Sequence, residues 1–367
     1  MELLLVLSIL TGQLVKIPLA GNPGLILLDL AVIIFSFWGL IKLKFHLKKP
    51  TLLITLPLLF FFVSVTCLAV TPLKLSLQQN LISLSYGIRF FIYVLFGWVI
   101  YSKGLPAIHP SRVFKLSAIG LSILGLIQLI FLPDLGFITP NAWDPHYFRA
   151  VSTYLDPNFL GVFLVLPFFP FPQAAILLYI AILTTFSRSS YLMLLITGLV
   201  FALLTKSKNL AIITIILFVG LIFSFNLYTN LVAKPRNIDR IQSASYRLGT
   251  WQQGVEIFLK SPLTGVGFNA YKFALVEYNL GNDQFLESRG STYNDSSLLS
   301  VLATTGILGF GTYLAWLGMT LIHGLKSKNF LFVSCLIGLI ITSFFNNVLF
   351  YPPILLWIIL SEIKENG

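Results

Sequence analysis

Residues 291–322 read STYNDSSLLSVLATTGILGFGTYLAWLGMTLI, and this stretch decides the class of the fold. Residues 301–322 contain no charged side chain and match the roughly 20 apolar residues that an α-helix needs to cross a bilayer. Hydroxyls, an amide and the carboxylate of Asp295 precede this run. The stretch therefore predicts a membrane helix with a carboxylate at its entrance, which either caps the helix or takes part in chemistry at the membrane surface.

The composition of the whole chain extends this prediction. Of the 367 residues, 57% are hydrophobic and only 10% are charged, whereas soluble domains carry about 25% charged residues. The apolar runs are rich in Ile, Leu, Val and Phe and do not alternate with polar residues, which favours helices over a lipid-facing barrel. We therefore expect an all-α integral membrane protein. Both cysteines, Cys67 and Cys335, fall inside apolar runs, so no disulfide framework is expected.

The apolar runs predict about twelve transmembrane helices. By residue number they are roughly 2–15, 24–43, 51–72, 81–101, 113–133, 158–171, 173–187, 189–205, 209–229, 296–322, 329–346 and 349–362. The first, sixth and twelfth runs are short, so ten or eleven crossings are the alternative.

Basic side chains set the orientation of these spans. They concentrate at alternate junctions: Lys42, Lys44, Lys48, Lys49, Lys103, Arg112, Lys115, Lys206, Lys208, Lys326, Lys328 and Lys364. The positive-inside rule places these junctions, and both termini, in the cytoplasm. We attribute the net charge of +11 to orientation and to contacts with anionic membrane lipids, not to nucleic acid. Most carboxylates then lie on the outer face, where ATP is not available.

The predicted organisation has three parts. Residues 1–229 hold spans one to nine, residues 230–295 form a large extracytoplasmic loop, and residues 296–367 hold the last three spans and a short cytoplasmic tail. Within the loop, a helix over 243–259 is expected, because apolar residues recur there at steps of three and four. These are Ala244, Leu248, Trp251, Val255 and Phe258. Such an amphipathic helix is typical of the membrane interface.

Two arginines within or beside apolar runs are candidate functional residues. Arg188 lies between two spans and is flanked by Ser187 and Ser189. Its guanidinium either holds a phosphate or diphosphate or extends to the interface without a ligand. Arg89 is the most deeply placed basic residue, and we expect it either to pair with an acid inside the bundle or to contact a ligand.

The outer loops add further arginines. Arg149 precedes the sequence Asp156-Pro157-Asn158, which is a typical helix entry. Arg236, Arg240 and Arg247 follow span nine and either bind lipid headgroups or guide a polyanionic lipid substrate.

Asn294, Asp295 and Ser296 are all favoured N-cap residues, so a capping role competes with a role for Asp295 as proton acceptor. No His, Cys or carboxylate pair has the spacing of zinc ligands, and there is no Walker loop. We expect neither a metal site nor a cofactor.

Four stretches, in the same order, resemble the O-antigen ligase and O-antigen polymerase superfamily of bacterial inner membranes. They are YLDPNFLGVFLVL, TTFSRSSYLMLLITG, YRLGTWQQGVEIFLKSPLTGVGFNAY and DSSLLSVLATTGILGFGTYL. They are similar to the family's D-P-N helix entry, its S-R turn, its R…W…P…G-x-G surface helix and turn, and the G-hydrophobic-hydrophobic-G helix that closes the outer loop. The resemblance covers residues 80–350 approximately.

The resemblance implies a membrane-helical (GT-C-like), metal-independent glycosyltransferase in the bacterial cytoplasmic membrane. The donor would be a glycan on undecaprenyl diphosphate and the acceptor another glycan or a lipid. Arg188 and Arg247 match motif positions. With the residues above, this gives a catalytic set of Asp295, Arg188 and Arg247. The diphosphate- or substrate-binding set is Arg89, Arg149, Arg240, Ser187, Ser189, Trp251, Asn294 and Ser296.

The chain departs from the family at one point. Ligases of this family typically have His-Asn where this chain has Asp295-Ser296, which favours polymerisation or another glycan transfer over ligation to lipid A–core. If Asp295 is not the base, His146 or Glu287 is the alternative. A secondary transporter or a lipid-glycan flippase is the competing function, although no repeated halves are visible in the sequence.

Overall fold

The computed structural model of the chain describes residues 1–18, 24–106, 108–136, 146–236, 242–282, 285–286 and 289–363. Helices dominate these residues, as the sequence predicts. Their only strands are β1 (Lys16–Pro18) and β2 (Gly24–Ile26), an antiparallel pair in which Ile17 lies opposite Leu25. The chain divides into two compact units, each of which is described by itself below. The first unit comprises Met1–Val15, His109–Tyr246 and Lys328–Thr342, and the second comprises Lys16–Ile108, Arg247–Ser327 and Ser343–Gly367.

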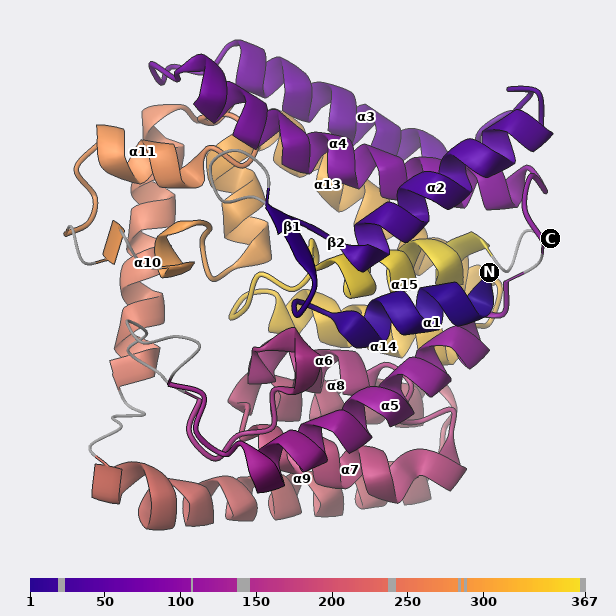
Figure 1. Cartoon of the computed structure of the whole chain (residues 1–367), viewed down its shortest axis with the longest axis vertical. Helices are drawn as coiled ribbons and strands as arrows, with labels where there is room; N and C mark the ends of the chain where they lie inside the picture. The colour runs from indigo at the N-terminus through magenta and orange to yellow at the C-terminus, as the bar shows by residue number, and fades with distance from the viewer. Residues whose placement is uncertain are drawn as a thin grey trace. The chain divides into compact units, whose positions relative to one another are not determined.

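Seven α-helices build the first unit. They are α1 (Glu2–Thr11), α5 (Pro110–Phe131), α6 (Pro157–Val165), α7 (Ala175–Thr185), α8 (Arg188–Leu204), α9 (Lys208–Tyr228) and α14 (Phe330–Thr342). Helix α8 packs against α14 and α9, and α1 packs along α5 (Figure 1). Small residues allow these approaches: a Cβ at Gly198 or Gly338 would lie about 2.4 Å from the Thr214 hydroxyl or 2.3 Å from the Thr197 hydroxyl, respectively.

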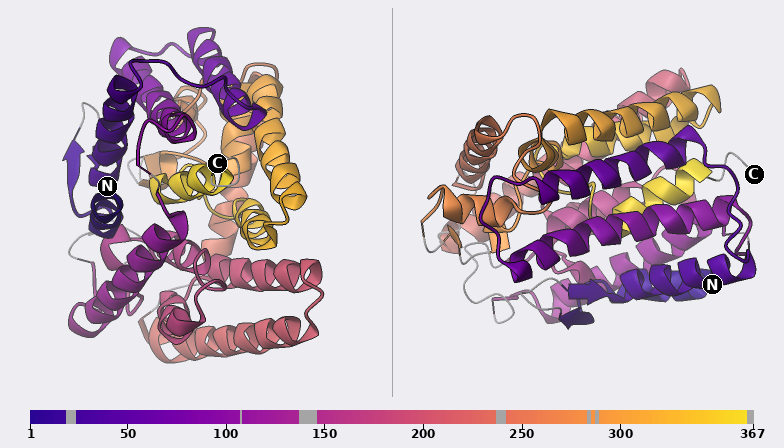
Figure 2. Two further views of the ribbon diagram at one scale, coloured as in Figure 1. Left: turned by 90° about the vertical axis from the view of Figure 1, so that its right-hand side faces the viewer. Right: turned by 90° about the horizontal axis from the view of Figure 1, so that it is seen from above.

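The second unit contains α2 (Leu27–Lys42), α3 (Leu52–Ala69), α4 (Leu77–Tyr101), α10 (Gln242–Lys260), α11 (Tyr271–Glu277), α13 (Ser297–Lys326) and α15 (Pro352–Ile363). Helix α10 enters this unit at Arg247. Helices α3 and α4 run side by side (Figure 2), and α3 also packs on α13. Aromatic rings fill the space between them: Phe60 meets Phe90 and Tyr313 with ring centroids 5.3 and 5.0 Å apart.

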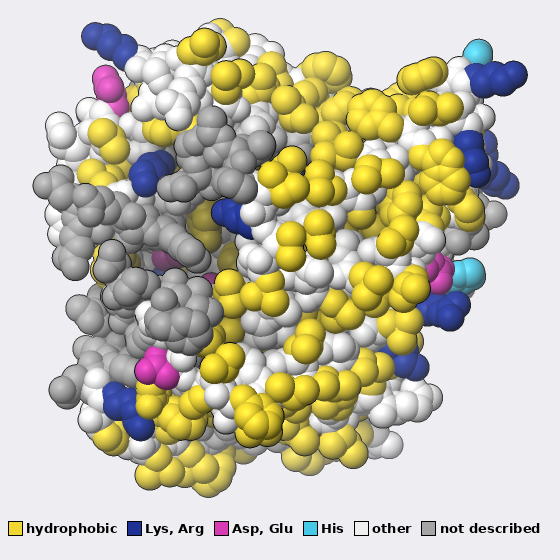
Figure 3. Space-filling model, in the orientation of Figure 1, with side chains coloured by type: hydrophobic (Ala, Val, Ile, Leu, Met, Phe, Trp, Pro, Cys, Tyr) yellow, Lys and Arg dark blue, Asp and Glu magenta, His cyan; other side chains and the backbone are white. Residues whose placement is uncertain are grey.

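Each predicted span overlaps a helix of the structure, although the spans predicted at 2–15 and 329–346 are helical only as far as Thr11 and Thr342, and the span predicted at 24–43 begins with strand β2. Among the described residues, five helical segments are long and apolar enough to cross a membrane: Leu52–Ala69, Leu77–Tyr101, Pro110–Phe131, Lys208–Arg236 and Ser297–Lys326. Many large apolar side chains are exposed, and they dominate the visible face in Figure 3. The chain is therefore a multi-pass membrane protein, whereas the number of crossings stays a prediction. The segment predicted at 158–171 is helical only as far as Val165, because Pro167 and Pro170 cannot continue the helix.

Helix α13 is broken at Gly306, whose φ of 60° and ψ of −165° are not helical. Residues 261–267, hereafter the 261–267 loop, lie across this break. Four backbone hydrogen bonds join the two: Ile307 N–H to Pro262 O (2.9 Å), Leu308 N–H to Leu263 O (3.3 Å), Val266 N–H to Ala303 O (3.2 Å) and Gly267 N–H to Thr304 O (2.8 Å). Within a membrane an unsatisfied backbone group costs several kcal/mol, so an interrupted helix needs such partners.

Two glycines make this crossing sterically feasible. A Cβ at Gly306 would lie 2.4 Å from the carbonyl of Leu263, and a Cβ at Gly265 would lie 2.3 Å from the carbonyl carbon of Thr304. Both residues also have positive φ, 60° and 64°, which other L-residues adopt only with strain. Helix α3 and the turn after it add contacts, because Thr71 donates to the carbonyl of Val266. Gly265 and Gly306, which lie in the stretches that resemble the family's motifs, thus allow one backbone segment to pack closely on another.

Substitution of the glycine at the break should lower the stability of the second unit. We expect Gly306→Ala to destabilise the protein by at least about 1–2 kcal/mol, the cost of the left-handed backbone alone, with the overlap against Leu263 adding to it. Gly311→Ala, in the same helix but with nothing within 4 Å of the added Cβ, is the matched control and should be neutral or stabilising by less than about 1 kcal/mol. Thermal unfolding of the detergent-purified variants measures both. Equal melting temperatures for the Gly306→Ala and Gly311→Ala variants would refute the requirement for glycine at position 306.

Candidate functional site

The turn between α7 and α8 holds three of the predicted residues in the first unit. Helix α7 ends at Phe186, which has a left-handed backbone, and Ser187 caps α8 by accepting from the N–H of Ser190. The Ser187 hydroxyl lies 2.8 Å from the side-chain carbonyl of Asn158 and 3.0 Å from the hydroxyl of Ser189. These contacts tie the turn to the first residues of α6. Both serine hydroxyls therefore hold the turn, and their predicted role as substrate ligands stays a prediction.

The Asp156-Pro157-Asn158 sequence is a helix entry, as predicted. The Asp156 carboxylate accepts from the N–H groups of Asn158 (2.7 Å) and Phe159 (3.2 Å) at the start of α6. Because Asn158 also contacts Ser187, the start of α6 and the turn between α7 and α8 form one connected structure. The cap thus positions the turn that carries Arg188.

Arg149 is buried, with 4% of its surface exposed. Its Nε donates to the carbonyl of Thr185 (2.8 Å) and its Nη2 to the carbonyl of Phe186 (3.3 Å). These are carbonyls at the C-terminus of α7, where a helix leaves acceptors without intrahelical donors. In the positions observed, Arg149 anchors the turn that precedes Arg188.

Arg188 differs from Arg149 because its side chain is exposed. Its guanidinium carbon lies 5.7 Å from the centre of the Phe225 ring on α9. Arg236, also exposed, lies 4.4 Å from the ring of Tyr147. Nearby, Phe186 stacks on Tyr228 with ring centroids 4.2 Å apart, at the edge of an apolar groove. The groove measures about 280 Å³ and is lined by Leu129, Phe148, Phe186, Ser224, Leu227, Tyr228, Leu231 and Val232.

Asp295 lies in the second unit, directly before the N-cap of α13. The cap is Ser296, whose hydroxyl accepts from the N–H of Leu299 at 3.2 Å. The Oδ2 atom of Asp295 instead accepts from the hydroxyl of Thr250 on α10, at 3.1 Å. The same hydroxyl lies 3.0 Å from the carbonyl of Arg247. The carboxylate is therefore oriented by α10, and Ser296 performs the capping.

Asn294 fixes α10 against the start of α13. This residue is fully buried, and its Nδ2 donates to the carbonyl of Thr250 and to the Tyr271 hydroxyl at 3.0 Å. Its Oδ1 accepts from the N–H of Ser296 at 2.9 Å. A Cβ at Gly254 would lie 2.7 Å from the Asn294 amide nitrogen, so only glycine allows this approach.

Tyr271 completes the polar cluster. Burial raises the pKa of Tyr271 above its ordinary value, and the nearby Asp295 carboxylate raises it further, against the hydrogen bond from Asn294. The phenol therefore stays protonated and donates to the carbonyl of Thr250 at 3.3 Å. Trp251 follows Thr250 on α10, and its ring lies 5.8 Å from that of Phe345.

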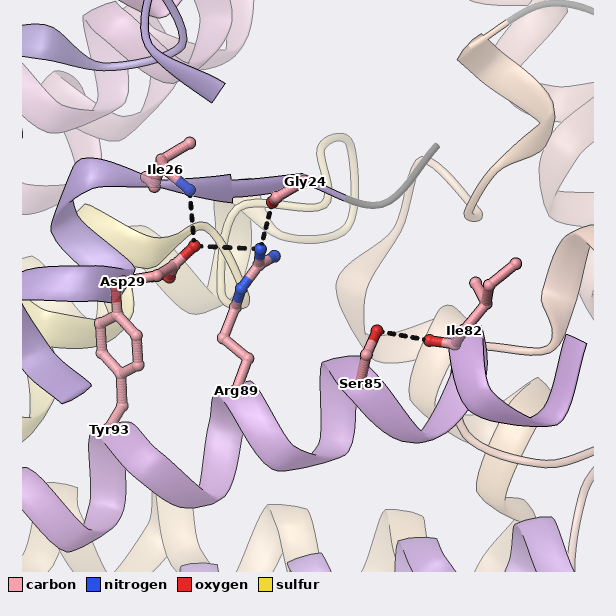
Figure 4. Close-up of polar contacts among 7 residues, drawn as sticks. All are labelled: Gly24, Ile26, Asp29, Ile82, Ser85, Arg89 and Tyr93. Carbon is pink, nitrogen blue, oxygen red and sulfur yellow. Dashed lines mark hydrogen bonds and ion pairs between the residues drawn. The ribbon is translucent and has the colours of Figure 1, made fainter. Parts of the chain in front are cut away.

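Arg89 is paired inside the second unit, as Figure 4 shows. Its Nη2 lies 3.0 Å from Oδ2 of Asp29 and donates to the carbonyl of Gly24 at 2.6 Å. Asp29 is 2% exposed and also accepts from the N–H of Ile26 and from the hydroxyl of Tyr93, both at 3.0 Å. Of the two roles that the sequence leaves open for Arg89, these contacts support the ion pair.

The predicted residues thus divide between the units. Arg149, Ser187, Arg188 and Ser189 lie in the first, and Arg89, Arg247, Trp251, Asn294, Asp295 and Ser296 lie in the second. Arg240 and the alternative base Glu287 lie outside the described residues. The other alternative base, His146, lies in the first unit.

A family model described as O-antigen ligase matches residues 173–314. This segment of the chain is therefore similar to the O-antigen ligase family. A search of curated protein sequences finds no match. The matched segment begins just before α7, includes Arg188, Arg247 and Asp295, and ends beyond the break at Gly306. It therefore contains the whole of the predicted catalytic set.

Sequence reasoning missed Thr250 and Tyr271. The position of Thr250 is a usable signal, because a residue three positions after Arg247 lies beside it on a helix. Tyr271 gave no signal, since its contact with Asn294 depends on how α11 packs.

An anchoring role for Arg149 predicts a loss of stability on conservative replacement. Lysine cannot donate to two carbonyls with the planar geometry of the guanidinium. We expect Arg149→Lys to lower the free energy of unfolding by about 1.5–3 kcal/mol, the worth of a charged hydrogen bond. The exposed Arg236→Lys change is the control and should alter it by less than about 0.5 kcal/mol. Melting temperatures in detergent distinguish the two.

The pairing of Arg89 with Asp29 predicts strong coupling between the two positions. Arg89→Met or Asp29→Asn alone leaves a buried charge without its partner and should cost about 3–5 kcal/mol. The double variant should cost clearly less than the sum of the single changes. Additive losses in thermal unfolding would mean that the ion pair does not hold this part of the second unit.

Proposed function

We propose that this protein belongs to the O-antigen ligase superfamily and is a metal-independent glycosyltransferase of the membrane-helical class. It takes a glycan from undecaprenyl diphosphate at the outer face of the bacterial cytoplasmic membrane. It then extends a second glycan or transfers the unit to another acceptor. The family match and the membrane-spanning helices support this proposal. The distribution of Lys and Arg supports cytoplasmic termini and an outer 230–295 loop.

The observation that carries the proposal is the geometry at Asp295. Its carboxylate bonds to Thr250, and Ser296 rather than Asp295 is the N-cap of α13. In the proposed reaction the oxygen of an acceptor hydroxyl forms a bond to the anomeric carbon of the donor. The bond from that carbon to the diphosphate oxygen breaks, the diphosphate leaves with the electron pair, and the hydroxyl proton passes to Asp295. A positioned base of this kind contributes about 10²- to 10⁴-fold to a rate.

The departing diphosphate requires positive charge placed in advance. We assign this role to Arg188 and Arg247. Arg188 is the first residue of α8, where the helix dipole also favours an anion. Arg149 positions the Arg188 turn by its bonds to Thr185 and Phe186 and is not itself assigned to the substrate.

Helix α10 has the surface expected of a helix in the membrane interface. Thr250, Gly254 and Ile257 are buried on one side. Leu248 and Val255 are 60% and 46% exposed, although both are apolar. An apolar face left uncovered by protein suits the boundary between headgroups and acyl chains. We propose that α10 lies there, between a lipid-linked donor and Asp295.

The test is an assay with purified protein in liposomes, supplied with undecaprenyl-diphosphate glycan. Release of undecaprenyl diphosphate and growth of the glycan are measured together. We expect Asp295→Asn to reduce both about 10²- to 10⁴-fold. Arg188→Ala should reduce them by at least about 10-fold through loss of charge stabilisation.

Two controls match these variants in charge. Glu256→Gln removes an exposed carboxylate on α10, and Arg112→Ala removes an exposed arginine at the start of α5. Both should leave the rate unchanged. Full activity in Asp295→Asn and Arg188→Ala would refute the site, and solute uptake without any lipid product would favour a carrier.

A further inference from the structure

Residues 343–351, SFFNNVLFY, have no part in the reaction proposed above and lie beyond the matched segment. This 343–351 segment folds back onto the start of α13. The N–H of Ser297 donates to the carbonyl of Ser343 at 2.8 Å. The Ser297 hydroxyl donates to the carbonyl of Asn346 and accepts from the N–H of Leu349, both at 3.2 Å. The segment is therefore held two residues away from Asp295.

Two polar atoms beside this segment have no hydrogen-bond partner among the described residues. They are Nε1 of Trp251 and Oδ1 of Asn347, each with less than 1 Å² exposed. Trp251 borders the segment through Phe345, and Asn347 is two residues further along. Burying polar groups without partners costs folding free energy, and a ligand that bonds both atoms would remove this cost. One atom is a donor and the other an acceptor, which suits a hydroxyl group that does both.

The chemistry around these atoms is neutral and aromatic. The rings of Trp251 and Phe345 are tilted by 32° to each other. Asn346 and Asn347 add amides. Aromatic faces with a few placed neutral polar groups are suited to a sugar ring, which has an apolar C–H face and a rim of hydroxyls. They are not suited to a diphosphate, which requires cations.

We propose that Trp251, Phe345 and Asn347 form the subsite for the acceptor sugar, with Trp251 Nε1 and Asn347 Oδ1 bonding its hydroxyls. This proposal rests on the proposed function, because it assigns the sugar whose hydroxyl Asp295 deprotonates. The fold supports the assignment: the contacts of Ser297 bring the segment to the same helix start that carries Asp295. A site built to bond hydroxyls discriminates strongly against sugars that lack them.

The experiment uses full-length protein in liposomes and, as the probe, the free glycan repeat released from the lipid donor by mild acid. Binding is measured by calorimetry, and transfer is measured with acceptor and donor varied separately. Trp251→Phe keeps the ring and removes the N–H, and Asn347→Leu keeps the shape and removes the acceptor. We expect each to weaken probe binding and raise the acceptor KM by at least about 10-fold, with the donor KM and kcat within about 3-fold of wild type.

Phe344→Leu is the control, because Phe344 belongs to the same segment but is 45% exposed. It should bind the probe as wild type does. Unchanged probe binding in both Trp251→Phe and Asn347→Leu would overturn the subsite, whatever the transfer rate. If the wild-type protein shows no transfer but binds the probe, and both variants lose this binding, the subsite is supported and the proposed reaction is refuted. Failure of the subsite and failure of the reaction are therefore distinguishable.

Discussion

The second unit depends on satisfying the backbone of a helix that is long and apolar enough to cross a membrane and is interrupted at one residue. At Gly306 the regular hydrogen bonding of α13 stops, and the 261–267 loop supplies the missing donors and acceptors. This arrangement fixes the loop, and the loop fixes the C-terminal end of α10, from which it leaves. Because Thr250 is on α10 and Asp295 is at the start of α13, the same backbone contacts determine where the carboxylate of the candidate site lies.

The arginines of the chain illustrate how a low-dielectric environment separates structural from chemical roles. Arg89 and Arg149 are largely withdrawn from the surface. Arg89 is bonded to a carboxylate and a carbonyl of the protein. Arg149 is bonded to two carbonyls. Arg188 is exposed at a helix N-terminus. A guanidinium that is bonded inside the bundle must lose those bonds and leave a buried site to hold a substrate, whereas the guanidinium of Arg188 lies at the surface.

The sequence was sufficient to predict the helices because apolar runs of span length have few other solutions in a bilayer. It also predicted the helix entry at Asp156 and the association of polar residues with the start of α13. It did not reveal the end of α6 at Val165, although Pro167 and Pro170 signalled it, nor the break in α13, because a single Gly306 in an apolar run is compatible with an unbroken helix.

At the candidate site, the sequence identified Asp295 but not the group that orients it. Thr250 and Tyr271 reach Asn294 and Asp295 through contacts between residues more than twenty positions apart, and one chain without packing information carries no sign of them. Arg89 was recognised as unusual, but the choice between ion pair and ligand required the position of Asp29.

Residues 295 and 296 have separate roles at the start of α13. Since Ser296 stabilises the helix start, the capping of α13 places no demand on the identity of its predecessor. The side chain at position 295 is instead constrained by Thr250 on another helix. We infer that residue 295 can be exchanged without loss of the helix cap, so that the same scaffold can carry a different side chain at this position.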